Sequence, residues 1–142
     1  MELKNQVVVI TGASRGLGAA FAEVLAEAGA VVVICSRNKD AVSAECDKIK
    51  EKGGSCSGYV VDVTKQDEVW KFIADIIEKH GRIDVLVNNA GAVHNRSNVE
   101  GISPSEYEEC IHTNVDSVFY FLHAVVPQMK QQNSGVIVNI SS

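Results

Sequence analysis

Short apolar runs alternate along the chain with stretches in which apolar residues recur every three or four positions. The runs VVVIT (7–11) and VVVIC (31–35) are rich in β-branched residues, which is typical of strands buried on both faces. Further apolar runs at 58–63, 83–91 and 135–140 predict three more strands.

Helical periodicity fills the segments between these strands. It predicts helices over 17–28, closed by Gly29, and over about 40–52 and 69–80. A last, long helix begins at a capping box in which Ser103 precedes Pro104 and Glu106 stands three positions after the serine. Its apolar stripe, predicted to pack mostly on the sheet, consists of Val115, Val118, Phe119, Leu122, Val125, Val126 and Met129.

The regular alternation of strand and helix predicts the fold class. Parallel strands need crossover connections, so this order favours a parallel sheet with helices on both faces. No repeat or low-complexity segment interrupts the pattern. We therefore expect residues 1–142 to form a single doubly wound α/β domain.

Composition and charge exclude several classes of partner. The 142 residues carry a formal net charge of −5 and no dense run of Lys or Arg, which argues against nucleic acid or an anionic membrane. No apolar stretch approaches the roughly 20 residues of a membrane span, and the start MELKNQ lacks the features of a signal peptide. A cytoplasmic protein is predicted. The four cysteines show neither a CxxC pair nor metal-ligand spacing, so neither a metal nor structural disulfides are expected.

The turn TGASRGLG (11–18) joins the first strand to the first helix. Its glycines do not match the spacing G-x-G-x-x-G. Glycines at this place nevertheless allow close backbone approach, and the N-terminus of the helix offers free N–H groups to an anion. A phosphate site is favoured here over a tight turn without a ligand.

Five motifs occur in an order that resembles the classical short-chain dehydrogenase/reductases. They are TGxxxGxG (11–18), DV (62–63), NNAG (88–91), HTN (112–114) and IVNISS (137–142). The resemblance spans nearly the whole chain. It implies a Rossmann-type sheet of five strands in the order 3-2-1-4-5, incomplete relative to the family, and NAD(H) or NADP(H) as cofactor.

The resemblance also implies roles for individual residues. Around the pyrophosphate and adenosine ribose it places Gly12, Ser14, Arg15, Gly16, Leu17 and Gly18. Asp62 and Val63 would meet the adenine, and Asn88, Ala90 and Gly91 would flank the middle of the cofactor. Turn-forming roles are the alternative for Asp62 and Asn88.

The end of the second strand distinguishes the two dinucleotides. An NAD site places a carboxylate there for the ribose 2′-OH, whereas an arginine accommodates a 2′-phosphate. The sequence reads Cys35-Ser36-Arg37-Asn38, with no acid before Asp40. Arg37 and Arg15 are both candidates for a 2′-phosphate, so the sequence favours NADP(H) over NAD(H), unless Arg37 is only a solvated surface residue.

Two residues match the family's catalytic set. Asn114 corresponds to its asparagine and Ser142 to its serine, but the family's Tyr-x-x-x-Lys pair is absent. Tyr59, Tyr107 and Tyr120 are followed four positions later by Val63, Ile111 and Ala124. A proton donor near working pH is what this chemistry needs. We therefore expect this chain to be the cofactor-binding part of a longer reductase. In this interpretation the chain ends at the catalytic serine, and the reductase continues beyond it.

The resulting functional hypothesis is an NADP(H)-dependent oxidoreductase that interconverts a small-molecule carbonyl and an alcohol. One alternative is a catalytically inactive dinucleotide-binding form that pairs with a full-length partner, and another is a fold without a ligand. The family resemblance further implies homo-oligomers through the helix at 105–131. The substrate and the direction of the reaction stay open.

Overall fold

Five parallel strands form one sheet in the order β3-β2-β1-β4-β5. The computed structural model describes residues 3–93 and 98–141. The strands are β1 (Val7–Thr11), β2 (Val31–Ser36), β3 (Ser55–Val60), β4 (Val85–Asn88) and β5 (Val136–Asn139). The predicted Rossmann-type fold with strand order 3-2-1-4-5 is confirmed.

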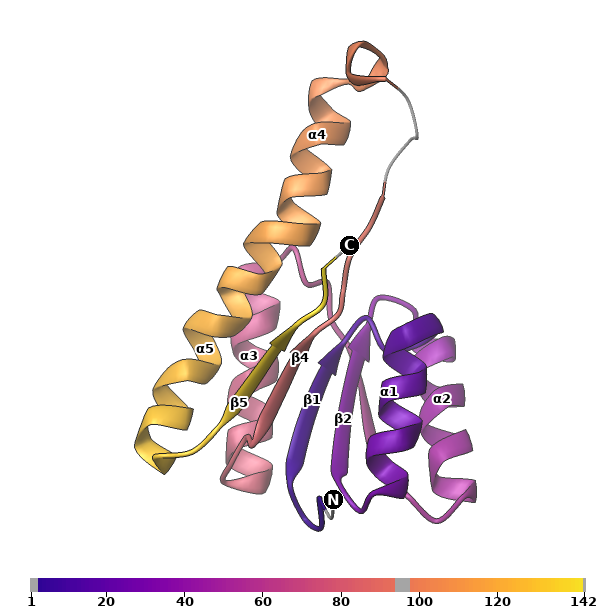
Figure 1. Cartoon of the computed structure of the whole chain (residues 1–142), viewed down its shortest axis with the longest axis vertical. Coiled ribbons are helices and arrows are strands. Elements are labelled where there is room, and N and C mark those ends of the chain that lie inside the picture. Colours follow the sequence, from indigo (N-terminus) through magenta and orange to yellow (C-terminus); the bar gives the residue numbers. More distant parts are fainter. Residues whose placement is uncertain (1–2, 94–97, 142) are drawn as a thin grey trace.

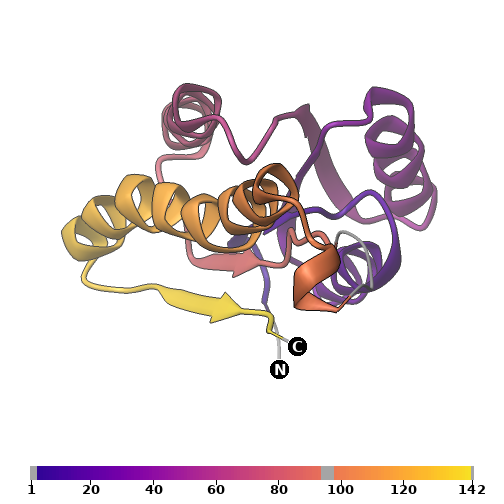
Figure 2. The same ribbon diagram turned by 90° about the horizontal axis from the view of Figure 1, so that it is seen from above.

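Helices cover both faces of this sheet (Figures 1 and 2). They are α1 (Gly16–Glu27), α2 (Lys39–Glu51), α3 (Gln66–His80), α4 (Pro104–Ile111) and α5 (Ser117–Gln132), with a 3₁₀ turn at Val99–Gly101 and a π-helix at His112–Asp116. One face carries α1 and α2, and the other carries α3 and α5. The rod formed by α4, the π-helix and α5 extends beyond the strand ends. Within the described ranges, no helix is long and apolar enough to cross a membrane.

The strands divide their side chains between two hydrophobic cores, as the sequence pattern requires. On β1, Val7 and Val9 pack on the side of α3 and α5, where Phe121 is buried. Val8 and Ile10 pack on the opposite side, against α1 and α2. Helices therefore cover both faces of the central strands and exclude solvent from them, and the ends of these strands are the places where a site can form.

The third strand lies earlier in the chain than its apolar run predicted. It pairs with β2 from Val31↔Ser55 to Ser36↔Val60, so 55–60 forms the strand instead of 58–63. The strand stands at the edge of the sheet and is half exposed, so its sequence alternates polar and apolar residues. Consequently Asp62 and Val63 follow the strand. The predicted segment 83–91, a strand that runs into a glycine-containing loop, holds the strand β4 at Val85–Asn88.

The long C-terminal helix is not one regular helix. The capping box of Ser103 and Glu106 forms as predicted, but a π-helix interrupts the rod. Within α5, which begins after the π-helix, the buried residues are Ser117, Phe121, Val125 and Met129, at a spacing of four. Val115 and Phe119, predicted in the core-facing stripe, are instead 54% and 60% exposed.

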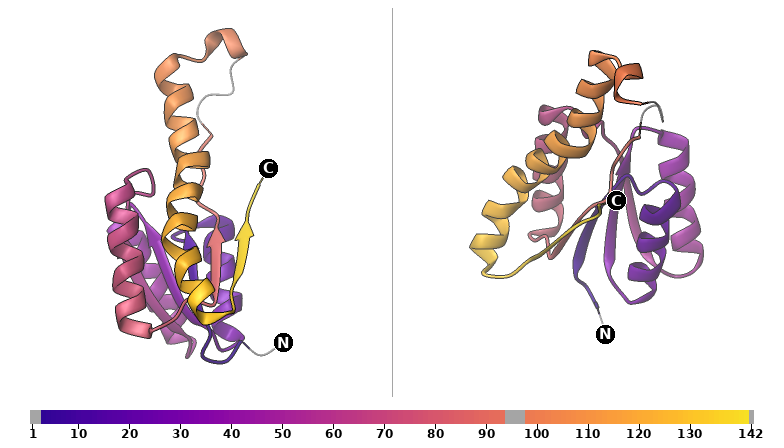
Figure 3. Two further views of the ribbon diagram at one scale, coloured as in Figure 1. Left: turned by 90° about the vertical axis from the view of Figure 1, so that its left-hand side faces the viewer. Right: turned by 45° about the horizontal axis from the view of Figure 1, so that its top comes forward.

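The strand β5 is the second edge of the sheet (Figure 3). Ile137 packs against the core on the α5 side, whereas Val136 is 56% exposed and Val138 is 39% exposed. The described residues thus leave an apolar strip uncovered on the opposite side. An edge of this kind offers unpaired backbone groups and apolar side chains to another segment of polypeptide.

Candidate functional site

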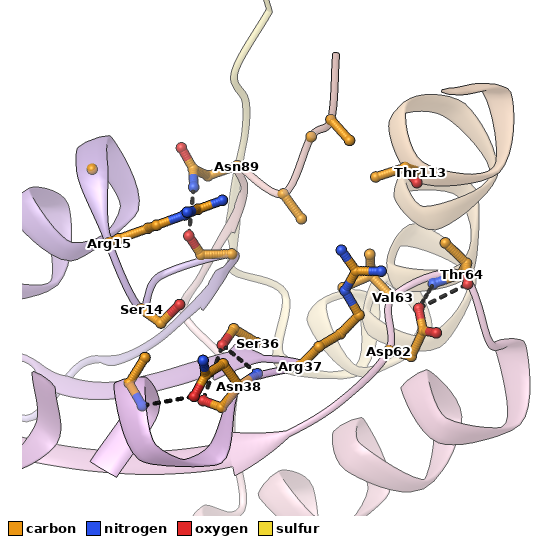
Figure 4. Close-up of a pocket in the computed structure, with 16 residues that line it drawn as sticks. Ser14, Arg15, Ser36, Arg37, Asn38, Asp62, Val63, Thr64, Asn89 and Thr113 are labelled. Carbon is orange, nitrogen blue, oxygen red and sulfur yellow. Dashed lines mark hydrogen bonds between the residues drawn. The ribbon is translucent and has the colours of Figure 1, made fainter. Parts of the chain in front are cut away.

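A cavity of about 550 Å³ lies at the carboxyl ends of the strands (Figure 4). It opens beside the boundary between β1 and β4, where the strand order reverses, and open α/β sheets bind ligands at that point. The lining residues are Gly12, Ser14, Arg15, Gly16, Ser36, Arg37, Asn38, Ala41, Asp62, Val63, Thr64, Asn89, Ala90, Gly91, Ala92 and Thr113.

The glycine-rich turn forms one wall of the cavity because it can pass very close to the β4 loop. A Cβ atom on Gly12, whose φ is +63°, would lie 2.8 Å from Ala90 Cα. A Cβ atom on Gly18 would lie 2.7 Å from Gly12 O. Gly16 has a similar φ of +60° but nothing within 4 Å of a Cβ atom. The turn therefore exposes its backbone and the N-terminus of α1 to the cavity.

Thr11 and Asn89 fasten the two loops together. Thr11 Oγ1 accepts hydrogen bonds from the backbone N–H groups of Asn89 (3.0 Å) and Ala90 (2.9 Å). The Asn89 Nδ2 group donates to the carbonyl oxygens of Thr11 (3.0 Å) and Gly12 (3.2 Å). These two residues were absent from the predicted site, because their partners are 77 to 79 residues away in sequence.

Two cations face the cavity. Figure 4 shows the side chains of Arg15, at the start of α1, and Arg37, after β2, projecting into it. The loop after β2 is held by Asn38, whose Oδ1 accepts a hydrogen bond from Ala41 N (3.0 Å) and caps α2. Among the described lining residues, Asp62 is the one carboxylate. The β2 end of the cavity is therefore suited to an anionic group.

Asp62 is held as an anion at the other side of the cavity. Its Oδ1 accepts hydrogen bonds from Thr64 N (3.0 Å) and Thr64 Oγ1 (2.7 Å). Partial burial by itself raises the pKa of Asp62, but the hydrogen bonds from Thr64 and the charge of Arg37 outweigh it and hold the pKa below 3.8. Asp62 is consequently an acceptor for a ligand donor, such as an amino group, at neutral pH.

Replacing Thr64 with Val is expected to raise the pKa of Asp62, because one of its two hydrogen bonds is lost. A carboxylate with a lowered folded-state pKa stabilises the fold above its unfolded-state pKa, and this contribution is lost as pH falls through the folded-state value. The stability gap between the wild type and Thr64→Val should therefore close below pH 3.8.

The pKa is measured by NMR titration of the Asp62 carboxyl carbon, and the stability by urea unfolding at several pH values. Thr113→Val is the matched control, since Thr113 also lines the cavity but makes no hydrogen bond to Asp62. An equal shift in both variants would contradict the role assigned to the Thr64 hydroxyl.

Asn114 lies in the π-helix and bonds to the loop after β4, beside the cavity. Its Nδ2 donates to the carbonyl oxygens of Ala92 (2.8 Å) and Cys110 (2.9 Å), and its Oδ1 accepts from Ala92 N (3.2 Å). Asn114 thus joins the rod to the loop after β4, while the neighbouring Thr113 lines the cavity. Ser142, the other predicted catalytic residue, lies outside the described residues.

The structure brings nine of the twelve predicted cofactor residues to the cavity wall and leaves three off it. Leu17 is 64% exposed on α1, and Gly18 packs against the turn. Asn88 is 4% exposed, and its Nδ2 donates to Asn139 Oδ1 (2.9 Å) across β4 and β5. Those at the wall are Gly12, Ser14, Arg15, Gly16, Arg37, Asp62, Val63, Ala90 and Gly91.

The donor set fits the phosphate groups of a dinucleotide. Free N–H groups at a helix N-terminus and arginine side chains bind phosphate, and the close approach at Gly12 keeps the turn free of side chains that would block it. A doubly wound sheet with this cavity at its switch point defines the class of dinucleotide-binding α/β proteins.

Comparison with known proteins identifies the family. The profile described as short chain dehydrogenase matches residues 6–142, so the chain belongs to the short-chain dehydrogenase/reductase family of oxidoreductases. A 3-oxoacyl-[acyl-carrier-protein] reductase from Staphylococcus epidermidis is 38% identical over 139 residues, which are 97% of this chain and 57% of that protein. The chain spans about half to three fifths of the length of the curated relatives it matches.

Solved structures show the same fold with either dinucleotide. A metagenomic short-chain oxidoreductase in complex with NADP superposes with a TM-score of 0.95 at 37% identity, covering 99% of this chain and 63% of that one. An NAD⁺-bound xylitol dehydrogenase superposes with a TM-score of 0.96 at 32% identity, covering 100% of this chain and 55% of that one. The family thus binds nicotinamide dinucleotides, and the choice between them depends on individual residues.

Proposed function

We propose that this protein is an NADP(H)-dependent oxidoreductase that interconverts a small-molecule carbonyl and an alcohol, and that this chain is its cofactor-binding part. The observation that carries the proposal is Arg37, which faces the cavity directly after β2, where an NAD site would place a carboxylate. The nicotinamide, when bound, supplies or accepts the hydride.

Each part of the cavity has a binding task in this proposal. The turn at Gly12 and the N-terminus of α1 hold the pyrophosphate, and Arg15 and Arg37 hold the 2′-phosphate. The Asp62 carboxylate accepts from the adenine amino group, with Val63 beside the ring.

The remaining predicted residues belong to the middle of the cofactor and to the substrate side. Ala90 and Gly91 line the wall next to the nicotinamide ribose, and Asn88, which precedes them, bonds to Asn139. Asn114 holds the loop after β4 beside that ribose. Ser142 is assigned to the carbonyl oxygen of the substrate, by the family match alone.

Replacing Arg37 with Ala is expected to weaken NADPH binding roughly 10- to 100-fold, because one charge-assisted contact worth about 1.5–3 kcal/mol is lost. NADH binding should change little, since NADH has no 2′-phosphate. Titration calorimetry with both nucleotides measures the effect. The fluorescence of Trp70 would not be a suitable measure of nucleotide binding, because Trp70 does not line the cavity. Its ring stacks on that of His123, with the ring centroids 5.2 Å apart.

Lys39→Ala is the matched control for this experiment. Lys39 is an exposed cation two residues further along, and it does not line the cavity. Its loss should leave both affinities nearly unchanged. Tighter binding of NADH than NADPH by the wild type, or equal losses in the two variants, would overturn the NADP(H) assignment.

A second candidate function is nucleotide binding without catalysis. It is favoured by the absence of a Tyr-x-x-x-Lys pair anywhere in the 142 residues. In this version the chain binds NADP(H) and pairs with a longer copy of the reductase. Co-expression with a full-length relative, followed by co-purification, tests the pairing.

The exposed apolar residues of the rod support self-association as part of the proposal. Tyr107, Val115 and Phe119 are 61%, 54% and 60% exposed on the helical segment 105–131. A second copy packed on this surface would remove them from water. Light scattering on the purified protein counts the subunits.

Location in the cytoplasm stays a prediction.

A further inference from the structure

Cys46 and Cys56 form a buried pair of thiols that the sequence does not reveal. Cys46 lies on α2 and Cys56 on the edge strand β3, and their sulfur atoms are 2.7 Å apart. The two residues are 4% and 5% exposed. A disulfide bond has a length of about 2.05 Å, so little movement separates the thiols from bonding distance.

A close helix–strand contact holds the pair together. A Cβ atom on Gly58 would lie 2.3 Å from Val42 Cγ1 and 3.1 Å from Cys46 Sγ, so the absence of a side chain at Gly58 lets α2 settle onto β3. Cys56 and Gly58 are two residues apart on the strand and therefore face the same helix. Both cysteines belong to the core on the side of α1 and α2.

The two sulfur atoms are chemically unequal. A hydrogen bond from Cys56 stabilises the thiolate of Cys46 and lowers the pKa of Cys46, and the charge of Lys50 acts in the same direction. The same shared proton, together with burial, raises the pKa of Cys56. The thiolate is the reactive form of cysteine, and the contact holds the two sulfur atoms 2.7 Å apart whichever of them loses its proton.

We propose that Cys46 and Cys56 are a redox site that hydrogen peroxide converts into a disulfide joining α2 to β3. The thiolate of one cysteine attacks one peroxide oxygen, the O–O bond breaks, and that cysteine becomes a sulfenic acid as water is released. The thiol of the other cysteine then attacks the sulfenic sulfur, the S–O bond breaks, and a second water leaves. Two thiols are oxidised and one hydrogen peroxide is reduced to two waters.

The surroundings favour a disulfide over a metal site. Across residues 3–93 and 98–141, no group of three or more His, Cys, Asp and Glu side chains is arranged to hold an ion. The strand β3 is an edge strand with only one neighbour, β2, so local opening can admit a small peroxide. This inference rests on the contact between α2 and β3 and is independent of the proposed nucleotide site.

The test treats the purified chain with hydrogen peroxide, blocks the remaining thiols, and maps tryptic peptides without reduction. Cleavage after Lys48, Lys50 and Lys52 separates the two cysteines, so the disulfide links peptide 40–48 to peptide 53–65. We expect this linked pair, lighter by two hydrogen atoms than its parts, to dominate and to disappear on treatment with dithiothreitol. The melting temperature of the oxidised chain should rise, because the bond restricts the unfolded state.

Two comparisons make the result specific. Cys35→Ser and Cys110→Ser should retain the link and Cys46→Ser should lose it, and the same treatment in concentrated urea should give mixed pairings among the four cysteines. Recovery of 40–48 and 53–65 as separate peptides from the folded wild type would overturn the proposal. An equal yield of links to Cys35 or Cys110 would overturn it as well, and neither outcome requires that a variant fold.

Discussion

The purified chain is expected to bind NADPH and to leave a carbonyl substrate unreduced. Among the described residues of the cavity wall, the titratable side chains are Arg15, Arg37 and Asp62. Arginine stays protonated, and the hydrogen bonds from Thr64 and the charge of Arg37 hold the pKa of Asp62 below its ordinary value. None of these groups can donate a proton to an alkoxide near neutral pH, and general acid catalysis contributes about 10²- to 10⁴-fold to such reactions.

The tyrosines of the chain do not supply the missing acid. Tyr59 packs against Phe72 with ring centroids 5.0 Å apart, and burial raises its pKa. Tyr107 is 61% exposed on α4, and Tyr120 lies against Phe119. None of the three lines the cavity.

The assay follows NADPH absorbance with a 3-oxoacyl thioester as substrate. The Staphylococcus epidermidis 3-oxoacyl-[acyl-carrier-protein] reductase, at 38% identity, serves as the positive control. Substrate-dependent consumption of NADPH by this chain above the rate without protein would contradict the prediction. Nucleotide binding measured in parallel distinguishes an inactive site from an unfolded chain.

Replacing Gly12 with Ala is expected to destabilise the fold more than replacing Gly16 with Ala. The two glycines have φ values of +63° and +60°, so a side chain costs about 1–2 kcal/mol of backbone strain at either position. At Gly12 the new Cβ would also lie 2.8 Å from Ala90 Cα, and such overpacking adds about 1–3 kcal/mol. A natural domain has about 5–15 kcal/mol of stability in total.

Urea unfolding of both variants measures this difference. Gly16→Ala is a matched control because its Cβ would meet nothing within 4 Å. Since the backbone strain is shared, the difference between the variants isolates the contact between the turn and the β4 loop. Equal free energies of unfolding would show that Ala90 moves away freely, and the close approach would then have no role in shaping the cavity.

Most of the residues that line the cavity could be predicted from the sequence, because they belong to motifs at strand ends. Gly12 and Arg37 follow the first two apolar runs and Asp62 stands near the end of the third, and parallel strands bring such positions to one edge of the sheet. The predicted strand at 58–63 was wrong by three residues at each end, yet this error did not move Asp62 away from the site. Site prediction here depended on the order of motifs more than on exact boundaries.

Contacts between segments that are distant in sequence could not be predicted in this way. Thr11 and Asn89 lie 78 residues apart, and nothing in their separate surroundings indicates that they bond. Val115 and Phe119 fit the helical period of the predicted stripe, but α5 packs on the sheet through Phe121, Val125 and Met129 and leaves both of them exposed. Cys46 and Cys56 lacked any motif, and the absent side chain at Gly58 brought them together.

The sequence by itself thus determined the fold class, the strand order, the family and most of the cavity wall. The fold class follows from local periodicity, which is a property of short segments, whereas the strand order, the family and most of the wall residues follow from the resemblance that five motifs in order carry. Only the tertiary structure decided the strand register at the sheet edge, the outward turn of Phe119 and the pairing of Cys46 with Cys56. Each of these depends on how closely two packed elements approach, and that distance is set by side chains from both of them.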